Sequence, residues 1–496
     1  METLSLLGSG FAGALETYNV LMLLLGVAVG ILGGAMPGLS ASTTVALLLP
    51  LTYGMPPDTS IILLAATYVG AEYGGSISAI FINTPGTPGA IVTTFDGYPL
   101  TKRGYPIKAL CFSLVPGTIA GLLANVALIT ISIPLVEFAL KFGPAEYFAL
   151  GVFGLATISS LTEGSVTKAM LAAAIGLLLA TIGTDTTIGF PRFTFEYPEL
   201  LDGIPLVPAL IGMLALSEAF MMVEELGTRA LLPQRFSHEY PTWPEWKSVM
   251  PASLRGSVIG LVIGAIPGAG STIASIISYS VEKRASRHPE KFGTGTPEGI
   301  AGPEAANNAV VGGTLIPMLT LGIPGSATAA IMISALMLHG LQPGPELFSK
   351  NPEVVYNLFA SQFLANLAML ALGLIGMTWW IKIVEVPKAV LAPCIIAICF
   401  VGSYAVGGNI WDIGVVVVFG IGGYSMRKLD IPVAPTVLAL VLGFMVEANF
   451  RRMLLISGGD WLGPLMRPIT AVLLALALIS FVVPFWRTYR RRQAIL

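Results

Sequence analysis

Evenly spaced glycines occur in two copies in this chain, and each copy ends in a Pro-Gly pair. The first copy is GVAVGILGGAMPG at residues 26–38, and the second is GSVIGLVIGAIPG at residues 256–268. Six residues of the two copies are identical in one register, with a constant offset of 230 (from 26 to 256). This agreement predicts that the chain consists of two homologous halves.

The spacing of these glycines constrains how the helices can pack. Glycines at i, i+4 and i+8 form a smooth stripe on one face of a helix, against which another backbone can lie in van der Waals contact. The Pro-Gly pair then ends the helix, because Pro lacks an N–H and Gly tolerates left-handed dihedral angles. A break inside a bilayer is tolerated only where protein buries it or a wet cavity faces it. Close packing with an ordinary proline kink would explain one copy, whereas two copies in register favour a functional break.

The composition predicts an all-α polytopic membrane protein. Hydrophobic residues make up 54% of the chain and charged residues 11%, whereas soluble domains carry about 25% charged residues. The apolar stretches leave room for roughly 10 to 14 membrane segments, including re-entrant ones. The net charge of −2 indicates no nucleic-acid partner. The three cysteines lie in apolar runs, and their odd number argues against a disulfide framework or a zinc site.

Composition also divides the chain into five parts. They are a short polar N-terminal lead (1–16), a first membrane repeat (17–225), a polar linker (226–252), a second membrane repeat with a final span (253–486), and a basic tail (487–496). The basic tail predicts a cytoplasmic C-terminus.

Four Pro-Gly pairs in apolar surroundings predict helix breaks. They are Pro37-Gly38, Pro85-Gly86, Pro267-Gly268 and Pro324-Gly325. The second and fourth pairs lie in INTPGTPG and LGIPGSAT, which resemble each other at an offset of 239 (from 86 to 325). The segments after the first and third pairs are too short to cross a bilayer, so we expect re-entrant hairpins there.

Basic loops occupy different places in the two repeats. In the first repeat the loop after PGTPG is basic, and in the second repeat the loop after PGAGS is basic. The residues are Lys102, Arg103 and Lys108 in the first, and Lys283, Arg284, Arg287 and Lys291 in the second. Equivalent loops therefore carry opposite charge bias, which under the positive-inside rule predicts two repeats of inverted topology. Inverted repeats with broken helices are the usual plan of secondary transporters.

Small polar residues at the breaks predict a binding site for a carboxylate substrate. A helix that begins inside the membrane presents free N–H groups and about half a positive charge, and hydroxyl groups add donors. The carbonyls that end the preceding helix can coordinate Na⁺. The alternative is that these hydroxyls satisfy only one another and the kinked backbone. The candidate substrate-binding residues are Pro37, Gly38, Ser40, Ser42, Thr43, Asn83, Thr84, Pro85, Gly86, Thr87, Gly268, Ser271, Thr272, Asn307, Asn308, Pro324, Gly325 and Ser326.

Two acidic residues in apolar surroundings are candidates for binding a coupling ion. A carboxylate such as Glu72 is costly inside a membrane unless it is paired, protonated or hydrated. The structural alternative places Glu72 near the end of a span. Glu304 follows Pro303, so it could instead sit in the first turn of a helix and compensate the helix dipole. The adjacent Asn307 and Asn308 cannot share one helix face, so at most one reaches a given ligand.

Enzyme signatures do not emerge from the sequence. The three histidines are scattered, and we find no HExxH, nucleophile elbow, Walker A or Rossmann fingerprint. We therefore predict that the chain is not an enzyme and has no cofactor or metal beyond a possible transported Na⁺. Uphill transport would then need an ion gradient. A passive channel would instead show a continuous polar stripe or rings of charge.

The same segments resemble the large membrane subunit of the tripartite tricarboxylate transporters, the TctA family. The resemblance covers nearly the whole chain. It rests on GGAMPGLSASTTVALLLPLTYGM, GAEYGGSISAIFINTPGTPGAIVTTFDGYP, RFTF at 192–195, GPEAANNAVVGGTLIPMLTLGIPGSATAAI and GFMVEANFRRMLLISGGD.

This resemblance implies a function that composition does not show. The chain would be the translocation subunit of a binding-protein-dependent secondary transporter that imports tricarboxylates or related carboxylates by Na⁺ or H⁺ symport. Its partners would be a periplasmic carboxylate-binding protein, a small four-helix membrane subunit, the carboxylate and membrane lipid. It would lie in a bacterial inner membrane and, by looser analogy, move in an elevator fashion. A passive anion channel and a stand-alone carboxylate permease stay open as alternatives.

Overall fold

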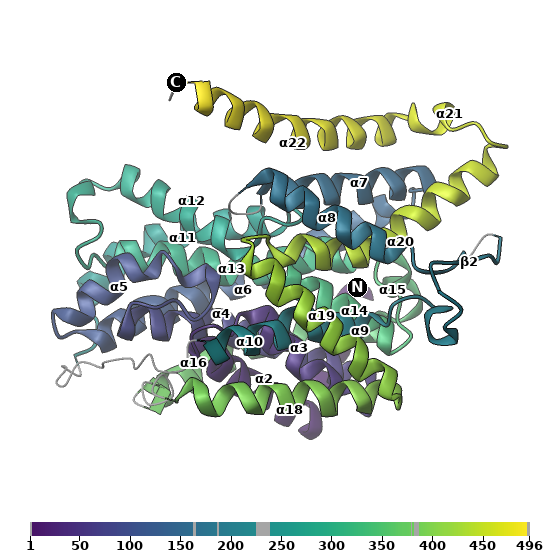
Figure 1. The fold of residues 1–496 in the computed structure, drawn as a ribbon. Coiled ribbons are helices and arrows are strands. Elements are labelled where there is room, and N and C mark those ends of the chain that lie inside the picture. Colours follow the sequence, from purple (N-terminus) through teal and green to yellow (C-terminus); the bar gives the residue numbers. More distant parts are fainter. Residues whose placement is uncertain are drawn as a thin grey trace.

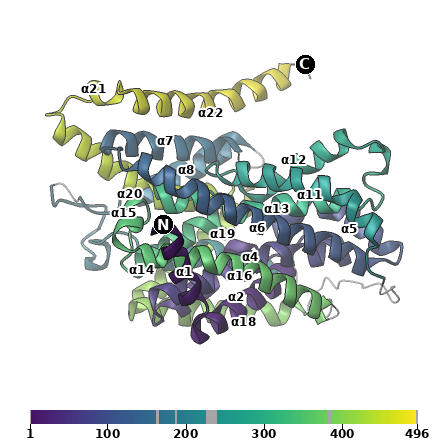
Figure 2. The same ribbon diagram turned by 180° about the vertical axis from the view of Figure 1, so that it is seen from behind.

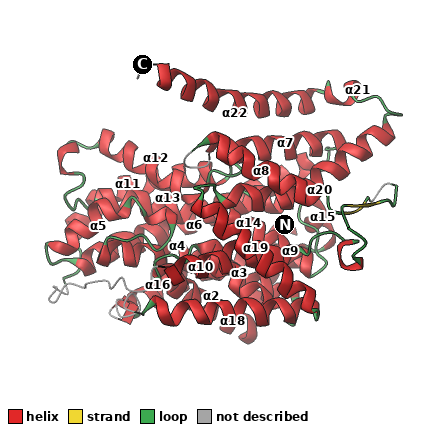
Figure 3. Cartoon of the chain, viewed as in Figure 1, coloured by secondary structure: helices red, strands yellow, loops and turns green. Residues whose placement is uncertain are grey.

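The described part of the chain is almost entirely helical (Figures 1 and 3). The computed structural model describes residues 2–161, 165–185, 188–224, 239–377, 379–380 and 386–493. The first-half helices are α1 (Glu2–Ala14), α2 (Thr17–Ala35), α3 (Ala41–Leu48), α4 (Pro57–Ile82), α5 (Thr93–Lys102), α6 (Pro106–Ala139), α7 (Pro144–Leu161), α8 (Val166–Ala180), α9 (Leu206–Leu210), the π-helix η4 (Ile211–Leu216) and α10 (Ser217–Glu224). The two strands β1 (Gly183–Thr184) and β2 (Pro191–Arg192) pair antiparallel between α8 and α9.

The second half contains the same succession of broken helices, in α11 to α14, as the first half does in α2 to α5. Its helices are α11 (Trp243–Gly264), α12 (Gly270–Ala285), α13 (Glu298–Leu321), α14 (Ala327–Leu338), α15 (Pro345–Lys350), α16 (Pro352–Ile375), α18 (Lys388–Gly407), α19 (Ile410–Lys428), α20 (Val433–Ile456), α21 (Leu462–Leu465) and α22 (Pro468–Gln493). The short 3₁₀ helices are η1 (Leu49–Thr52), η2 (Pro88–Ala90), η3 (Pro198–Leu200) and η5 (Pro289–Lys291).

Seven helical segments of the described chain are long and apolar enough to cross a membrane. They are α2, α6, Leu206–Glu224, α16, α18, α19 and α20. Four shorter apolar segments accompany them: Ala41–Thr52, Val166–Ala180, Ala327–Leu338 and Pro468–Val482. The predicted fold class, an all-α polytopic membrane protein, is therefore confirmed. The number of segments that cross the bilayer stays a prediction, because length and composition alone do not distinguish a span from a re-entrant helix.

The glycine stripes pack against backbone in both halves, as the sequence predicts. Helix α2 lies along α4, and α11 lies along α13. In the first half, a Cβ atom on the stripe would come within 3.0 Å of a facing carbonyl oxygen in the pairs Gly26–Leu63, Gly30–Thr67 and Gly34–Ala71. In the second half, the same is true of Gly256–Gly302, Gly260–Ala306 and Gly264–Val310. The glycines differ by the offset of 230 and their partners by the offset of 239, so the two halves repeat this interface residue for residue.

We expect that Gly30→Ala and Gly260→Ala each destabilise the protein. The added methyl group would overlap a carbonyl oxygen of the facing helix, and overpacking of this kind costs about 1–3 kcal/mol. The midpoint of thermal unfolding in detergent measures the effect. Gly422→Ala is the matched control, because no atom lies within 4 Å of a Cβ at that helical glycine of α19. Equal midpoints for all three variants would show that the stripe is not a close contact.

The outer helices are exchanged between the halves. Helices α7 and α8 of the first half pack on α20 of the second. In the equivalent way, α18 and α19 of the second half pack on η4 and α10 of the first. Helix α22 lies against α7 at the edge of the bundle (Figures 1 and 2). Each half is therefore completed by elements of the other.

Contacts at the two ends of the bundle indicate how the two halves are oriented. Asp96 of α5 accepts hydrogen bonds from the backbone N–H groups of Gly295 (2.7 Å) and Thr296 (2.8 Å), which follow α12. We call residues 96–108 and 283–296 the basic end, because the two predicted basic loops meet there. At the other end, the Asn357 side chain donates to Asp58 Oδ2 (2.7 Å). In Figure 1, α5 lies at one end of the bundle and α15 at the other.

This pairing of loops is crossed. Two repeats in the same orientation would bring the loop after α3 beside the loop after α12. Instead, Asp58 in the first turn of α4 meets Asn357 of α16, and the loop after α12 meets α5. The pairing agrees with the inverted topology that the distribution of basic residues predicts.

Helices cross several of the predicted domain boundaries, which stay predictions. The end of the predicted linker, 243–252, forms the first turns of α11, because a capping box between Thr242 and Glu245 starts the helix earlier than its polar composition indicates. Residues 226–238 lie outside the described residues. The predicted N-terminal lead contains helix α1, which packs on α16. The predicted tail continues α22 to Gln493, and 494–496 are not described.

Candidate functional site

The four predicted breaks interrupt helices, and they converge on one cavity. Gaps in helical structure separate α2 from α3, α4 from α5, α11 from α12 and α13 from α14. The cavity has a volume of about 620 Å³ and is lined by residues from all four gaps. Its other wall comes from α10, α19 and the start of α20. Ligand sites are typically clefts of about 300–1,000 Å³, so this one has the size of a site for a small molecule.

The breaks have the same backbone geometry in the two halves. Gly38 and its counterpart Gly268 both have left-handed φ angles, +98° and +79°. Asn83 and its counterpart Gly322 end α4 and α13, again with left-handed φ angles of 57° and 71°. A non-glycine residue with positive φ is uncommon, and Asn is one of the few that tolerate it. Asn83 therefore acts as a helix cap, and its side chain does not line the cavity.

Three helices begin at the cavity wall. Ser40 caps α3 by accepting the N–H of Thr43 (3.1 Å), and Ser326 caps α14 by accepting the N–H of Ala329 (3.1 Å). Helix α12 has no side-chain cap, and Ser271 in its first turn lines the cavity. Helix N-termini carry partial positive charge and free N–H groups. The cavity wall is therefore suited to an anion even where it holds no cationic side chain.

The structure brings part of the predicted site together. Predicted residues that line the cavity are Gly38, Ser40, Ser42, Pro85, Gly86, Thr87, Gly268, Ser271, Thr272 and Ser326, together with the carboxylate Glu72. Predicted residues outside its lining are Pro37, Thr43, Asn83, Thr84, Asn307, Asn308, Pro324, Gly325 and Glu304. Whether the first group binds substrate stays a prediction.

Two residues outside the lining have structural roles instead. The Thr43 hydroxyl bonds to Ser40 Oγ (2.8 Å), so at this position the hydroxyls satisfy one another, which was the alternative explanation. The Gly325 carbonyl accepts the N–H of Gly268 (3.0 Å) and ties the third break to the fourth.

Glu72 lies in the interior of α4, with 4% of its surface exposed, and its carboxylate borders the cavity. The alternative placement near the end of a span is wrong, because α4 continues for ten residues beyond it, to Ile82. The Asn307 side chain donates to the backbone carbonyl of Glu72 (3.0 Å). Three buried oxygens, Glu72 Oε2, Asn307 Oδ1 and Thr87 Oγ1, have no hydrogen-bond partner among the described residues. Buried oxygens without partners are costly, so they indicate a missing donor or cation.

Glu304 is fully buried and bonded on both carboxylate oxygens. Its partners are the hydroxyls of Thr93 and Ser113, the latter at 3.2 Å. The proposed place in a first helical turn is wrong, because α13 already begins at Glu298. Asn308 faces Gly117 of α6, whereas Asn307 bonds to Glu72. The expectation that the two asparagines do not share a face is confirmed.

An ion pair in the cavity wall was not predicted from the sequence. Arg427, in the last turn of α19, lies with Nη1 2.7 Å from Glu218 Oε2 on α10. Arg427 is the one cationic side chain among the described residues that line the cavity. The sequence offered one signal, since Glu218 lies between apolar runs in the same way as Glu72.

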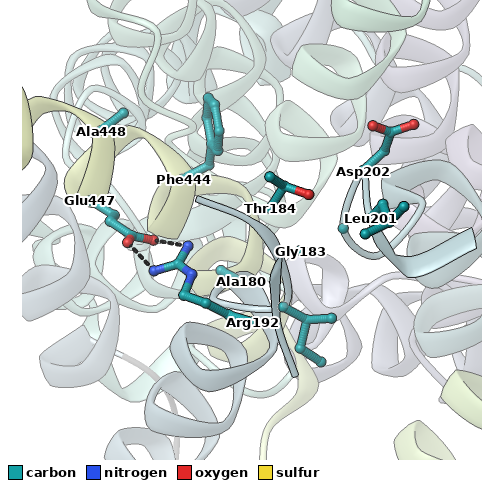
Figure 4. A pocket seen from close by; sticks show the side chains of 11 residues that line it. Ala180, Gly183, Thr184, Arg192, Leu201, Asp202, Phe444, Glu447 and Ala448 are labelled. Carbon is teal, nitrogen blue, oxygen red and sulfur yellow. Dashed lines mark hydrogen bonds and ion pairs between the residues drawn. The ribbon is translucent and has the colours of Figure 1, made fainter. Parts of the chain in front are cut away.

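A second, smaller cavity of about 270 Å³ lies between the β1–β2 hairpin and α20. Figure 4 shows the Arg192 guanidinium facing the Glu447 carboxylate, which accepts two hydrogen bonds from it. Arg451 pairs with the same Glu447 (2.9 Å) and with Asp185 (2.7 Å). These charges already compensate one another, so the network anchors the hairpin and is less suited to an anionic ligand. It joins RFTF at 192–195 to the late EANFRR segment.

Comparison with known proteins decides the family. The model of the tripartite tricarboxylate transporter TctA family matches residues 20–438. The chain belongs to the TctA family. The resemblance of the sequence motifs is thereby confirmed, and the family description makes this TctA-family chain part of a transporter with several subunits. Together with the apolar helices, it identifies a multi-pass membrane protein.

Two relatives come from Agrobacterium vitis, and both are uncharacterized. The chain is 37% identical over 493 residues to a 52.8 kDa protein of the TAR-I ttuC' 3' region, a match that covers 99% of this chain and 98% of the relative. It is also 37% identical over 234 residues to a protein of the TAR-II ttuC' 3' region, which covers 47% of this chain and 97% of that relative.

Proposed function

We propose that this chain is the translocation subunit of a cation-coupled importer of tricarboxylates or related carboxylates. The observation that carries the proposal is the convergence of four helix breaks on one cavity of about 620 Å³. A transporter needs a site of this kind near the middle of the membrane, at the interface of its repeats. The helix N-termini of α3, α12 and α14 give that site the polarity that a carboxylate needs.

The two walls of the cavity differ in origin, which supports alternating access. One wall consists of the broken helices of both halves, and the other consists of α10, α19 and α20. Movement of the first wall against the second would carry the bound anion across the membrane. An elevator motion of this kind is part of the proposal.

The coupling cation binds next to the anion in this proposal. Glu72 brings negative charge to the cavity that would receive an anion, and like charges in a partly dry site repel strongly. A bound Na⁺ or a proton on Glu72 removes this repulsion. The unpartnered oxygens of Asn307 and Thr87 are ligands of the type that hard cations prefer. Substrate and cation would then bind together and move together.

Membership of the family supports the remaining parts of the proposed system. A periplasmic carboxylate-binding protein would deliver the substrate, and a small four-helix membrane subunit would accompany this chain in a bacterial inner membrane. The basic end, with residues 96–108 and 283–296, would face the cytoplasm under the positive-inside rule. The C-terminus would lie on the same side.

We expect uptake of citrate or shorter dicarboxylates that requires both an ion gradient and the binding protein. Proteoliposomes containing the chain and its small subunit would receive radiolabelled carboxylates, with and without the binding protein, under an imposed Na⁺ or H⁺ gradient. Accumulation under only one gradient would identify the coupling ion. Uptake that needs neither would indicate a stand-alone permease, and flux far above carrier turnover would indicate a channel.

A further inference from the structure

We infer that Arg427 is the receptor for one carboxylate of the substrate, and that Glu218 holds this receptor while no substrate is bound. The inference rests on the proposed function, because it concerns the same cavity. Both side chains line that cavity, and they come from α19 and α10 on the wall opposite the helix breaks. A glutamate carboxylate has the chemistry of the group that we expect as cargo, so Glu218 shows how the guanidinium would hold it.

The position of Glu218 places its carboxylate between the two walls. One oxygen, Oε2, lies 2.7 Å from Arg427 Nη1. The other oxygen, Oε1, lies 3.1 Å from the point that a Cβ atom on Gly38 would occupy. Gly38 is the positive-φ residue of the α2–α3 break, two residues before the helix cap Ser40. A substrate carboxylate in this place would therefore contact the guanidinium on one wall and the N-terminus of α3 on the other.

Arg427 also retains a donor for a second oxygen. Its Nε is buried and has no hydrogen-bond partner among the described residues. A guanidinium binds a carboxylate best through two parallel hydrogen bonds, and the contact with Glu218 uses Nη1. A substrate carboxylate that engages Nε as well would satisfy this donor. Replacement of Glu218 by the substrate carboxylate is then favoured, because the guanidinium would make two parallel hydrogen bonds to the substrate.

A neighbouring ion pair also joins α19 to α10. Lys428, the next residue of α19, pairs with Glu224 of α10. That pair is well exposed, at 45% and 41% of the side-chain surface, and it lies outside the cavity lining. Glu218, in contrast, is only 12% exposed. Withdrawing a charge pair from water costs more than it usually returns in stability, so a second pair at the cavity is better explained by ligand exchange.

The arrangement also selects a class of substrate. A carboxylate on Arg427 leaves the N-termini of α12 and α14, with Ser271 and Ser326, for a second carboxylate. The cavity should therefore prefer dicarboxylates and tricarboxylates to monocarboxylates. Removing the guanidinium should reduce this preference, because only the second position would then remain.

The test compares the two partners of the pair, which should act in opposite directions. Arg427→Gln should raise the citrate concentration for half-maximal uptake by about 10- to 100-fold, the usual loss for a charged hydrogen bond. Arg427→Lys, which keeps the charge but not the fork, should raise it by about tenfold. Glu218→Gln should lower it by roughly 3- to 10-fold, because a competing carboxylate is removed. Lys428→Gln and Glu224→Gln are the matched controls and should leave it within about twofold of the wild type.

The outcomes separate this inference from the proposed function. Thermal unfolding midpoints with and without citrate, and with succinate and acetate, would be measured alongside uptake. A rise in half-saturation for both Arg427→Gln and Glu218→Gln, or none for Arg427→Gln and Arg427→Lys, would overturn the exchange while carboxylate transport stands. A wild-type protein that neither transports nor is stabilised by citrate or succinate would overturn the proposed function and the exchange with it.

Discussion

A Gly86→Val variant should reach the membrane in normal amounts and transport no carboxylate. A Cβ atom at this position would lie 2.7 Å from Ser78 Oγ and still closer to the carbonyl oxygen of Gly34. Gly86 also donates its N–H to the Gly75 carbonyl (3.1 Å), so the segment cannot move away without losing that bond. Valine would displace the wall formed by Pro85–Thr87. A displacement of about 1 Å at a reacting or binding group can cost about 100-fold in rate, so we expect uptake below about 1% of wild type.

The equivalent change in the second half should have the same result. A Cβ atom on Gly325 would lie 2.7 Å from the Gly264 carbonyl oxygen and 3.0 Å from Thr314 Cβ. Gly264 is the counterpart of Gly34, so the fourth break rests on the end of the glycine stripe as the second does. Gly325 itself does not line the cavity, and its carbonyl holds Gly268 at 3.0 Å. Gly325→Val should therefore displace both the third and the fourth break, and uptake should be abolished.

Gly54→Val is the control for these variants. Gly54 also lies between helical segments, but no atom lies within 4 Å of a Cβ built there. Its uptake should match that of the wild type. Membrane content is measured by immunoblot and folding by size-exclusion chromatography, so that lost uptake is not confused with lost protein. Normal uptake by Gly86→Val would show that residues 85–87 are not part of the translocation site.

The repeated interface could be predicted from the sequence because the responsible residues are local. Only glycine lets one backbone approach another as closely as Gly34 approaches Ala71 and Gly264 approaches Val310. The requirement is therefore written into the chain at fixed spacing, and the Pro-Gly pairs mark the ends of the stripes. The meeting of the basic loops at one end could also be predicted, because the distribution of Lys and Arg among the loops, which sets the orientation of membrane segments, is read directly from the sequence.

Other features depend on contacts between distant segments, which no local pattern encodes. Arg427 lies in the last turn of α19, where basic residues are common, so its sequence position does not mark it as a site residue. Its partner Glu218 comes from the other half, because the outer helices are exchanged. Glu304 was compatible with a first helical turn until the start of α13 at Glu298 excluded it. Asp96, which holds the loop after α12, lies in a short FDGYP segment without any distinguishing spacing.

The second large effect is expected for Glu72→Gln, which should uncouple transport from the ion gradient. The substitution keeps the shape of the side chain and removes its charge. Glu72 lines the cavity, is 4% exposed, and accepts a hydrogen bond from Asn307 at its backbone carbonyl, and its Oε2 has no hydrogen-bond partner among the described residues. If a cation must neutralise this carboxylate before an anion enters, the neutral variant binds the anion without the cation. Accumulation of citrate above its external concentration should be lost, whereas exchange of internal for external citrate should persist.

Glu304→Gln distinguishes this coupling role from a general effect of removing a buried charge. Glu304 is as deeply buried as Glu72, but its two oxygens are bonded to Thr93 and Ser113 and it does not line the cavity. Its replacement should lower the unfolding midpoint, because a buried hydroxyl loses a charged acceptor, and the response to the gradient should remain. An unchanged gradient response in Glu72→Gln would leave Glu72 with a structural role. If only Glu304→Gln lost the response to the gradient, the coupling cation would be assigned to Glu304 in the interior of α13, and not to Glu72 at the cavity.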